Sequence, residues 1–129
     1  YRGLQLRGLL TRSSIGDVAR INQRNELVGD ASVGELQGGW YVEAAFDVMT
    51  LAPQSRWRIA PYLRYERLDT QKEVPAGWTS SGGYDQEGLT AGIEIKPIHE
   101  VVLKLDHQWL KNEARTGVNR FNVALGYLF

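Results

Sequence analysis

The chain has 129 residues with 15 basic and 15 acidic side chains, so its formal net charge is zero. This balance leaves no electrostatic footprint for nucleic acid, and no nucleic-acid partner is expected. The absence of cysteine excludes disulfides and thiolate metal sites, and no segment approaches the roughly 18 consecutive apolar residues of a membrane-spanning helix.

Six segments alternate between apolar and polar residues with a period of two, which is the pattern of β-strands. Successive side chains of a strand point to opposite faces, so each segment has an apolar face and a polar face. The second segment, for example, places Trp40 and Val42 opposite Tyr41 and Glu43. In chain order the predicted strands cover residues 4–11, 40–48, 57–66, 89–96, 101–110 and 120–129.

Long and short links alternate between these segments. Up-and-down membrane barrels are built in this way, with short periplasmic turns and longer outer loops. The pattern therefore predicts an all-β fold of antiparallel, up-and-down transmembrane β-barrel strands, with Phe129 on the side of the short turns. The predicted links cover residues 13–36, 50–56, 68–85, 97–100 and 111–118, of which the first and third are the long outer loops.

The last segment supports a lipid-facing strand most directly. Phe121, Val123, Leu125, Tyr127 and Phe129 share one face of it. A soluble protein rarely presents so apolar an edge, whereas the outer face of a membrane barrel meets lipid.

Aromatic residues lie near the ends of the predicted strands, on their apolar faces. Trp40, Tyr65 and Trp109 lie at the loop end, and Trp57 and Phe129 lie at the turn end. This placement is typical of interfacial girdles, where an amphipathic ring has one wet edge.

Two local features test the strand assignment. Pro61 falls within the third segment and cannot donate to a ladder, so a bulge or an unpaired position is expected there.

The first long link has a helical pattern that Asp17 would cap and Gly29 would end. Such a helix either covers the rim of the barrel or folds into its lumen. Its apolar stripe would consist of Val18, Ile21, Leu27 and Val28.

The polar faces carry nearly balanced charge, and we interpret them as the wall of a water-filled lumen. The structural interpretation is a solvated wall in which opposite charges pair across the ladder. The functional interpretation is that Arg58, Arg64, Lys104 and Arg120 guide anions, because rings of charge set channel selectivity. The pore-lining candidates are Arg7, Glu43, Asp47, Arg58, Arg64, Glu66, Lys104, Asp106 and Arg120.

Small residues on the same faces favour an open lumen over a plugged one. They are Ala45, Ala60, Gly92, Ala124 and Gly126.

No catalytic constellation stands out, so neither an enzyme activity nor a cofactor is expected. The two histidines, His99 and His107, are too few and too scattered for a metal site, and His107 is expected to pack at the interface. The Gly38-Gly39 and Gly82-Gly83 pairs lack the following lysine of a phosphate-binding loop.

Four stretches of the chain resemble late strands of bacterial outer-membrane porins, in the porin-like family that includes the phosphate-selective porins. The resemblance covers nearly the whole chain and corresponds to the carboxy-terminal part of a typical member. It implies passive diffusion of ions and small polar solutes, location in a Gram-negative outer membrane, contact with outer-membrane lipid, a homotrimer, and recognition of Phe129 by the barrel-assembly machinery. The stretches are residues 39–47, 59–69, 96–108 and 123–129.

Six strands do not close a membrane barrel, for which about eight is the usual minimum, and lipid tolerates no open edge. We therefore expect residues 1–129 to be part of a larger barrel that further amino-terminal strands or a partner chain complete. Two alternatives remain open at this stage. One is a soluble β-barrel that binds a small apolar ligand inside, and the other is a membrane barrel that transports nothing.

Overall fold

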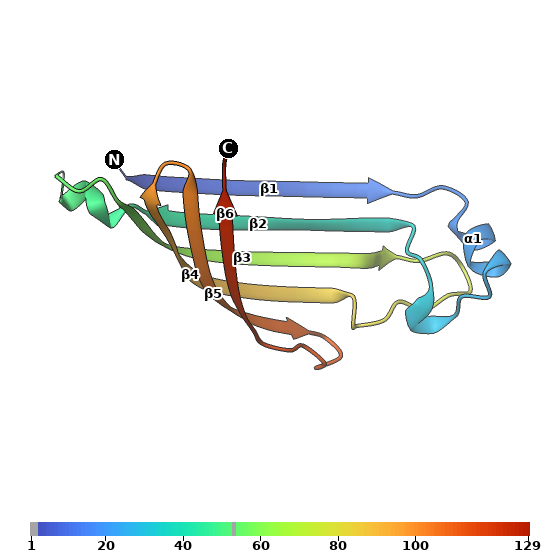
Figure 1. Ribbon diagram of the computed structural model, residues 1–129. Helices are drawn as coiled ribbons and strands as arrows, with labels where there is room; N and C mark the ends of the chain where they lie inside the picture. The colour runs from blue at the N-terminus through green and yellow to red at the C-terminus, as the bar shows by residue number, and fades with distance from the viewer. Residues whose placement is uncertain (1–2, 53) are drawn as a thin grey trace.

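The computed structural model, which describes residues 3–52 and 54–129, is an all-β fold with few helical residues. Six antiparallel strands form one open sheet in the order β1-β2-β3-β4-β5-β6 (Figure 1). The predicted six strands and their up-and-down connection are confirmed. The strands are β1 (Leu4–Ser14), β2 (Leu36–Phe46), β3 (Arg58–Glu73), β4 (Asp85–Ile98), β5 (Val101–Asn112) and β6 (Arg120–Tyr127).

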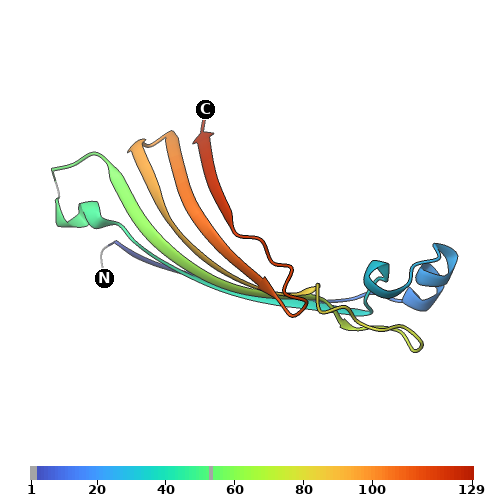
Figure 2. The same ribbon diagram turned by 90° about the horizontal axis from the view of Figure 1, so that it is seen from below.

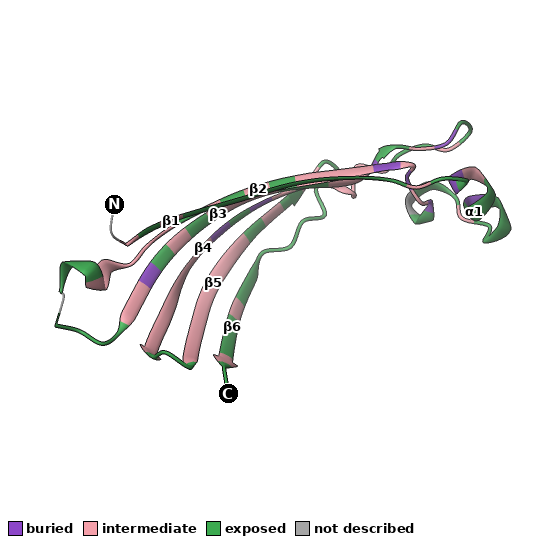
Figure 3. Cartoon of the chain, turned by 90° about the horizontal axis from the view of Figure 1, so that it is seen from above, coloured by how far each residue is buried: buried purple, intermediate pink, exposed green. Residues whose placement is uncertain are grey.

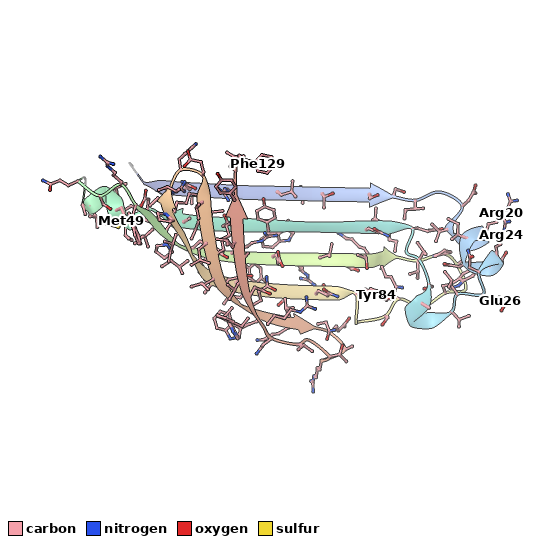
Figure 4. The ribbon with its side chains drawn as sticks, viewed as in Figure 1. Arg20, Arg24, Glu26, Met49, Tyr84 and Phe129 are labelled. Carbon is pink, nitrogen blue, oxygen red and sulfur yellow. The ribbon has the colours of Figure 1, made fainter. Side chains whose placement is uncertain are left out.

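The links divide the sheet into two ends. At the turn end, β2 and β3 are joined through the 3-10 helix η2 (Val48–Leu51), and a two-residue turn joins β4 to β5. The backbone N–H of Leu128 donates to the carbonyl of Glu100 in that turn, at 2.8 Å. Phe129 therefore lies at the turn end, as the alternation of long and short links predicted (Figure 4). The two long links lie at the opposite end, which we call the loop end.

Several strand boundaries differ from the prediction because backbone pairing outlasts the apolar alternation. β3 continues to Glu73 and β4 starts at Asp85, so the link between them covers residues 74–84 instead of 68–85. Residues 69–73 are all polar, so they show no period-two hydrophobic signal although they extend the ladder. β2 begins at Leu36 instead of residue 40 for a related reason, since Gln37 and two glycines precede Trp40.

The predicted turn-end boundary of β2 is wrong. The strand ends at Phe46, and Asp47 is the N-cap of η2. Its carboxylate accepts a hydrogen bond from the backbone N–H of Met49, at 3.1 Å, which competes with continued strand pairing. Trp57 likewise lies one residue before β3.

Pro61 is accommodated at an unpaired position without a bulge. Pairing between β2 and β3 ends at Ala45 and Tyr62, whereas pairing with β4 runs unshifted through Pro61 and Ile93. The N–H of Ile59 faces the β2 side, where it donates to Asp47 at 3.4 Å. By the two-residue repeat, the Pro61 nitrogen faces the same side, where no ladder partner remains.

The first long link contains the helix α1 (Val18–Arg24) and the 3-10 helix η1 (Gly29–Ala31). The expected side-chain cap is wrong, because Asp17 has φ 54° and its carboxylate makes no capping hydrogen bond. The helix ends at Asn25, so Leu27 and Val28 lie outside it and Gly29 begins η1. α1 lies beyond the strand ends and not over a sheet face, which matches the rim alternative (Figures 1 and 2).

The two long links pack together into a loop cluster, which we define as residues 15–35 and 74–84. Asn22, with 0% exposure, donates to the Val33 carbonyl at 3.1 Å and accepts from the Val33 N–H at 2.9 Å. The indole N–H of Trp78 donates to the Leu27 carbonyl at 3.0 Å. Val18 is buried beside them. These contacts hold both loops as one ordered unit.

We expect Asn22→Ala to destabilise the loop cluster by about 1–3 kcal/mol, because it leaves both buried backbone groups of Val33 without partners. Limited proteolysis of the folded protein should show faster cleavage within residues 25–35, with unchanged strand content by circular dichroism. Asn25→Ala is the matched control, since Asn25 is exposed and donates only to the Ile21 carbonyl. Equal cleavage rates for the two variants would contradict this role of Asn22.

The sheet is curved along its strands (Figure 2). Few residues of the strands are fully buried (Figure 3). The two faces of the sheet differ in exposure in the sense opposite to that of a soluble sheet. Ala60 and Thr90 on the polar face are 2% and 4% exposed, whereas Leu63 and Leu125 on the apolar face are 53% and 75% exposed. Side chains on the inside of a curve converge, so the lower exposure indicates that the polar face is the inner one.

Candidate functional site

The polar face of the sheet is the candidate site, and the strand register builds it row by row. Neighbouring strands place many of their charged and polar side chains beside one another. One lateral row consists of Arg7, Glu43, Arg64, Thr90, Gln108 and Arg120. The next row towards the turn end consists of Gln5, Ala45, Tyr62, Gly92, Asp106 and Asn122.

Glu94 on β4 is the centre of the densest charge cluster. Its carboxylate lies 3.3 Å from the Lys104 amine, 3.6 Å from the Lys96 amine and 4.0 Å from the Arg58 guanidinium. Arg58 also lies 3.9 Å from Asp47. Three cations thus share two carboxylates, and each cation keeps part of its surface exposed to water.

The remaining predicted cations on β1 and β3 are also paired. Arg7 donates to Glu43 across the β1–β2 ladder at 3.1 Å. Arg64 lies 2.6 Å from Glu66 on its own strand, and its guanidinium stacks 4.0 Å from the centre of the Tyr41 ring. These pairs fit the interpretation of a salt-bridged wall better than that of a ladder of free cations.

Arg120 differs from the other predicted cations. It begins β6, pairs in register with Gln108, and makes no ion pair within residues 3–52 and 54–129. Among the four basic residues expected to guide anions, it is the one whose charge is not offset by a carboxylate in the described part of the chain.

Asp106 on β5 lies in a hydrogen-bonded group instead of an ion pair. Its two oxygens accept from the Tyr62 hydroxyl at 3.1 Å and from the Asn122 amide at 2.7 Å. The group links β3, β5 and β6 across the inner face.

Tyr62 was not among the predicted lining residues, since a tyrosine among charged residues gives no distinctive sequence signal. Glu94 and Lys96 were assigned to the polar face but not to the site.

Two of the small residues expected to leave the lumen open, Gly92 and Gly126, have neighbouring side chains over them. A Cβ at Gly92 would lie 2.6 Å from the Tyr62 ring and 2.7 Å from the Asp106 Cβ, so both side chains fill the space above that glycine. A Cβ at Gly126 would lie 2.8 Å from Val102. These glycines admit neighbouring side chains and do not widen the inner surface.

The apolar face is a continuous layer over all six strands. Leu6, Ala44, Leu63 and Ala91 form one lateral row of it, and the row ends with His107 and Phe121. At its loop end, the rings of Trp40 and Tyr65 lie 5.4 Å apart, and those of His107 and Trp109 lie 4.6 Å apart edge to face. His107 is therefore a packing residue, as predicted.

Charged residues on the same face begin directly beyond Tyr65 on β3 and Trp109 on β5, and Arg67 lies in register with Trp40. Arg67 donates to both carboxylate oxygens of Asp85, at 3.1 and 2.7 Å, and lies 3.9 Å from Glu87. The apolar layer thus ends at an aromatic boundary followed by a charged one.

No group of three or more His, Asp or Glu side chains within residues 3–52 and 54–129 is placed to hold a metal ion. In the same residues, no helix has both the length and the apolar character needed to cross a membrane.

No protein-family model matches this chain, and no similar curated protein or solved structure is found.

Proposed function

We propose that the chain forms part of the wall of an outer-membrane β-barrel channel that passes ions and small polar solutes. One observation carries the proposal: each of the six strands has an exposed large side chain on the apolar face, and on β2 and β3 the opposite, charged face is the less exposed one. In water this arrangement is unfavourable, because exposed apolar area costs about 25 cal/mol per Å². In a bilayer the exposed side chains meet hydrocarbon, and the polar face meets a wet lumen.

The shape of the sheet supports the same proposal. Gly8, near the middle of β1, lies in one lateral row with Val42, Tyr65 and Leu89, the last of which is near the loop end of β4. The row therefore crosses β1 near its middle and β4 near its loop end, which means that the strands are tilted relative to the row. Barrel closure requires such a strand tilt together with a staggered register.

The two edges of the sheet define what the barrel still needs. β1 and β6 each pair on one side only. An unpaired edge in hydrocarbon costs several kcal/mol for each unsatisfied backbone group. In this proposal further strands, from the same polypeptide or a partner, pair with both edges. The resemblance to the porin-like family adds a homotrimer in the Gram-negative outer membrane and recognition of Phe129 by the assembly machinery.

The soluble alternative is less well supported. A soluble barrel with an apolar ligand inside needs its apolar face on the concave, less exposed side, which is the reverse of the exposure at Ala60 and Leu63. For the non-transporting alternative, the deciding property is whether the polar face lines a path for ions.

A pair of adjacent alanines on β2 tests the channel. The chain has no cysteine, so Ala45→Cys on the polar face and Ala44→Cys on the apolar face each introduce one thiol. In planar bilayers, a charged, membrane-impermeant methanethiosulfonate reagent should lower the single-channel conductance of Ala45→Cys and leave that of Ala44→Cys unchanged. These measurements are made on the completed barrel: absence of conductance before modification would refute the channel, and an effect at position 44 alone would reverse the faces.

A further inference from the structure

A groove on the apolar face, at its loop end, is not explained by the channel. Its volume is about 540 Å³, and it lies over β1, β2 and the end of β3. Gly38 lies at its centre, between Arg12 on β1 and Asp69 on β3 in the register. A Cβ at Gly38 would meet only the Thr11 carbonyl oxygen, at 3.4 Å, so the backbone does not require glycine there.

The groove is apolar on one side and cationic on the other. Towards the turn end it is lined by Leu10 and Trp40, which are 80% and 40% exposed. Three cations also line it: Arg67 lies in the same lateral row as Trp40, and Arg12 and Lys72 lie towards the loop end.

The cations of the groove are not equally available. Arg67 is paired with Asp85 and Glu87. Arg12 and Lys72 are exposed and make no ion pair within the described residues, 3–52 and 54–129. The one carboxylate that lines the groove, Asp69, accepts a hydrogen bond from the Gln71 N–H at 2.9 Å.

We propose that this groove binds a lipid whose head group is an anionic phosphate monoester. The phosphate lies over Gly38 between Arg12 and Lys72, and an acyl chain runs along Leu10 and Trp40. Both parts of the groove are needed for this ligand, because the cations match the phosphate and the exposed apolar floor matches the chain. The inference rests on the proposed function, since it requires the apolar face to meet lipid.

Quenching of Trp40 by brominated lipids separates the two proposals. Trp57→Phe, Trp78→Phe and Trp109→Phe leave Trp40 as the one tryptophan of this chain. In detergent micelles, brominated phosphatidylcholine should quench Trp40 if the apolar face meets lipid at all. Brominated phosphatidic acid should quench it at about tenfold lower mole fraction, because each basic residue near the surface strengthens the binding of anionic lipid.

Two variants and one matched control assign the preference to the groove. Gly38→Leu fills the groove without removing charge. The double variant Arg12→Gln with Lys72→Gln removes charge without filling the groove. Both should abolish the preference for phosphatidic acid and retain quenching by phosphatidylcholine. Arg20→Gln with Arg24→Gln removes two cations from α1, away from the sheet, and should change neither (Figure 4).

The possible results have different consequences. Failure of both lipids to quench Trp40 refutes the lipid-facing assignment itself. Quenching by phosphatidylcholine with no preference for phosphatidic acid overturns only the groove proposal, as does a preference that survives in both groove variants. Displacement of brominated phosphatidic acid by millimolar inorganic phosphate would show that the acyl chain is not recognised, and would also overturn it.

Discussion

Ala44→Arg is expected to lower the free energy of unfolding in a lipid bilayer by about 2–4 kcal/mol, whereas Ala45→Arg should change it by less than about 1 kcal/mol. The two alanines are consecutive residues of β2 and lie on opposite faces of the sheet. Ala44 pairs with Leu6 and Leu63 in the apolar layer, near the middle of the run from Trp40 to Phe46. In the proposed barrel, an arginine placed there would have to enter hydrocarbon.

Ala45 faces a different environment. It lies beside Gln5 and Tyr62 on the polar face, in a hollow that Arg7 and Glu43 also line. A guanidinium there remains in contact with water and carboxylates, so its desolvation cost is small.

Reversible denaturation of the protein in lipid vesicles, followed by tryptophan fluorescence, measures both free energies. Using the same substitution at adjacent positions cancels effects of β-propensity and of residue volume. Equal costs would show that neither face meets hydrocarbon. A larger cost at position 45 would indicate a dry protein interior behind the polar face, and would support a soluble barrel.

The strand number, the faces and the two ends of the sheet were predictable because one physical pattern encodes them. Alternation with period two assigns each residue to a face, and pairing in chain order then brings like faces together. The lateral row from Leu6 to Phe121 is therefore implied by the sequence once the hairpins form. The alternating link lengths, in the same way, placed Phe129 beside the short turn at Glu100.

The features that were missed depend on contacts between distant residues. The end of β3 was placed too early because Asp69 to Glu73 have no apolar periodicity, although Asp69 pairs with both β2 and β4 and Glu73 pairs with β2. The loop cluster depends on Asn22 and Trp78, which bond to backbone far along the chain. The role of Gly92 depends on Tyr62 and Asp106 from two other strands, which sequence spacing cannot reveal.

Glu94→Gln should shift ion selectivity towards anions. Glu94 is the shared partner of Arg58, Lys96 and Lys104 on the polar face, and their charges are largely offset while it is ionised. One unit charge about 6 Å from a passing ion in water contributes about 0.7 kcal/mol, which is about threefold for each ion. Because the effect has opposite signs for anions and cations, their relative permeability should change by about tenfold. The reversal potential across a potassium chloride gradient in planar bilayers measures this ratio.

Glu87→Gln is the matched control, because it removes the same charge from the same strand but on the apolar face. Glu87 pairs in register with Arg67 and Lys111, beyond the aromatic boundary. Glu87→Gln should leave the reversal potential unchanged. Lys104→Gln should shift the reversal potential in the sense of greater cation selectivity. An equal shift for the two glutamate variants would mean that ions sense net charge and not the polar face. No shift for Glu94→Gln, with conductance intact, would place the ion path elsewhere in the barrel.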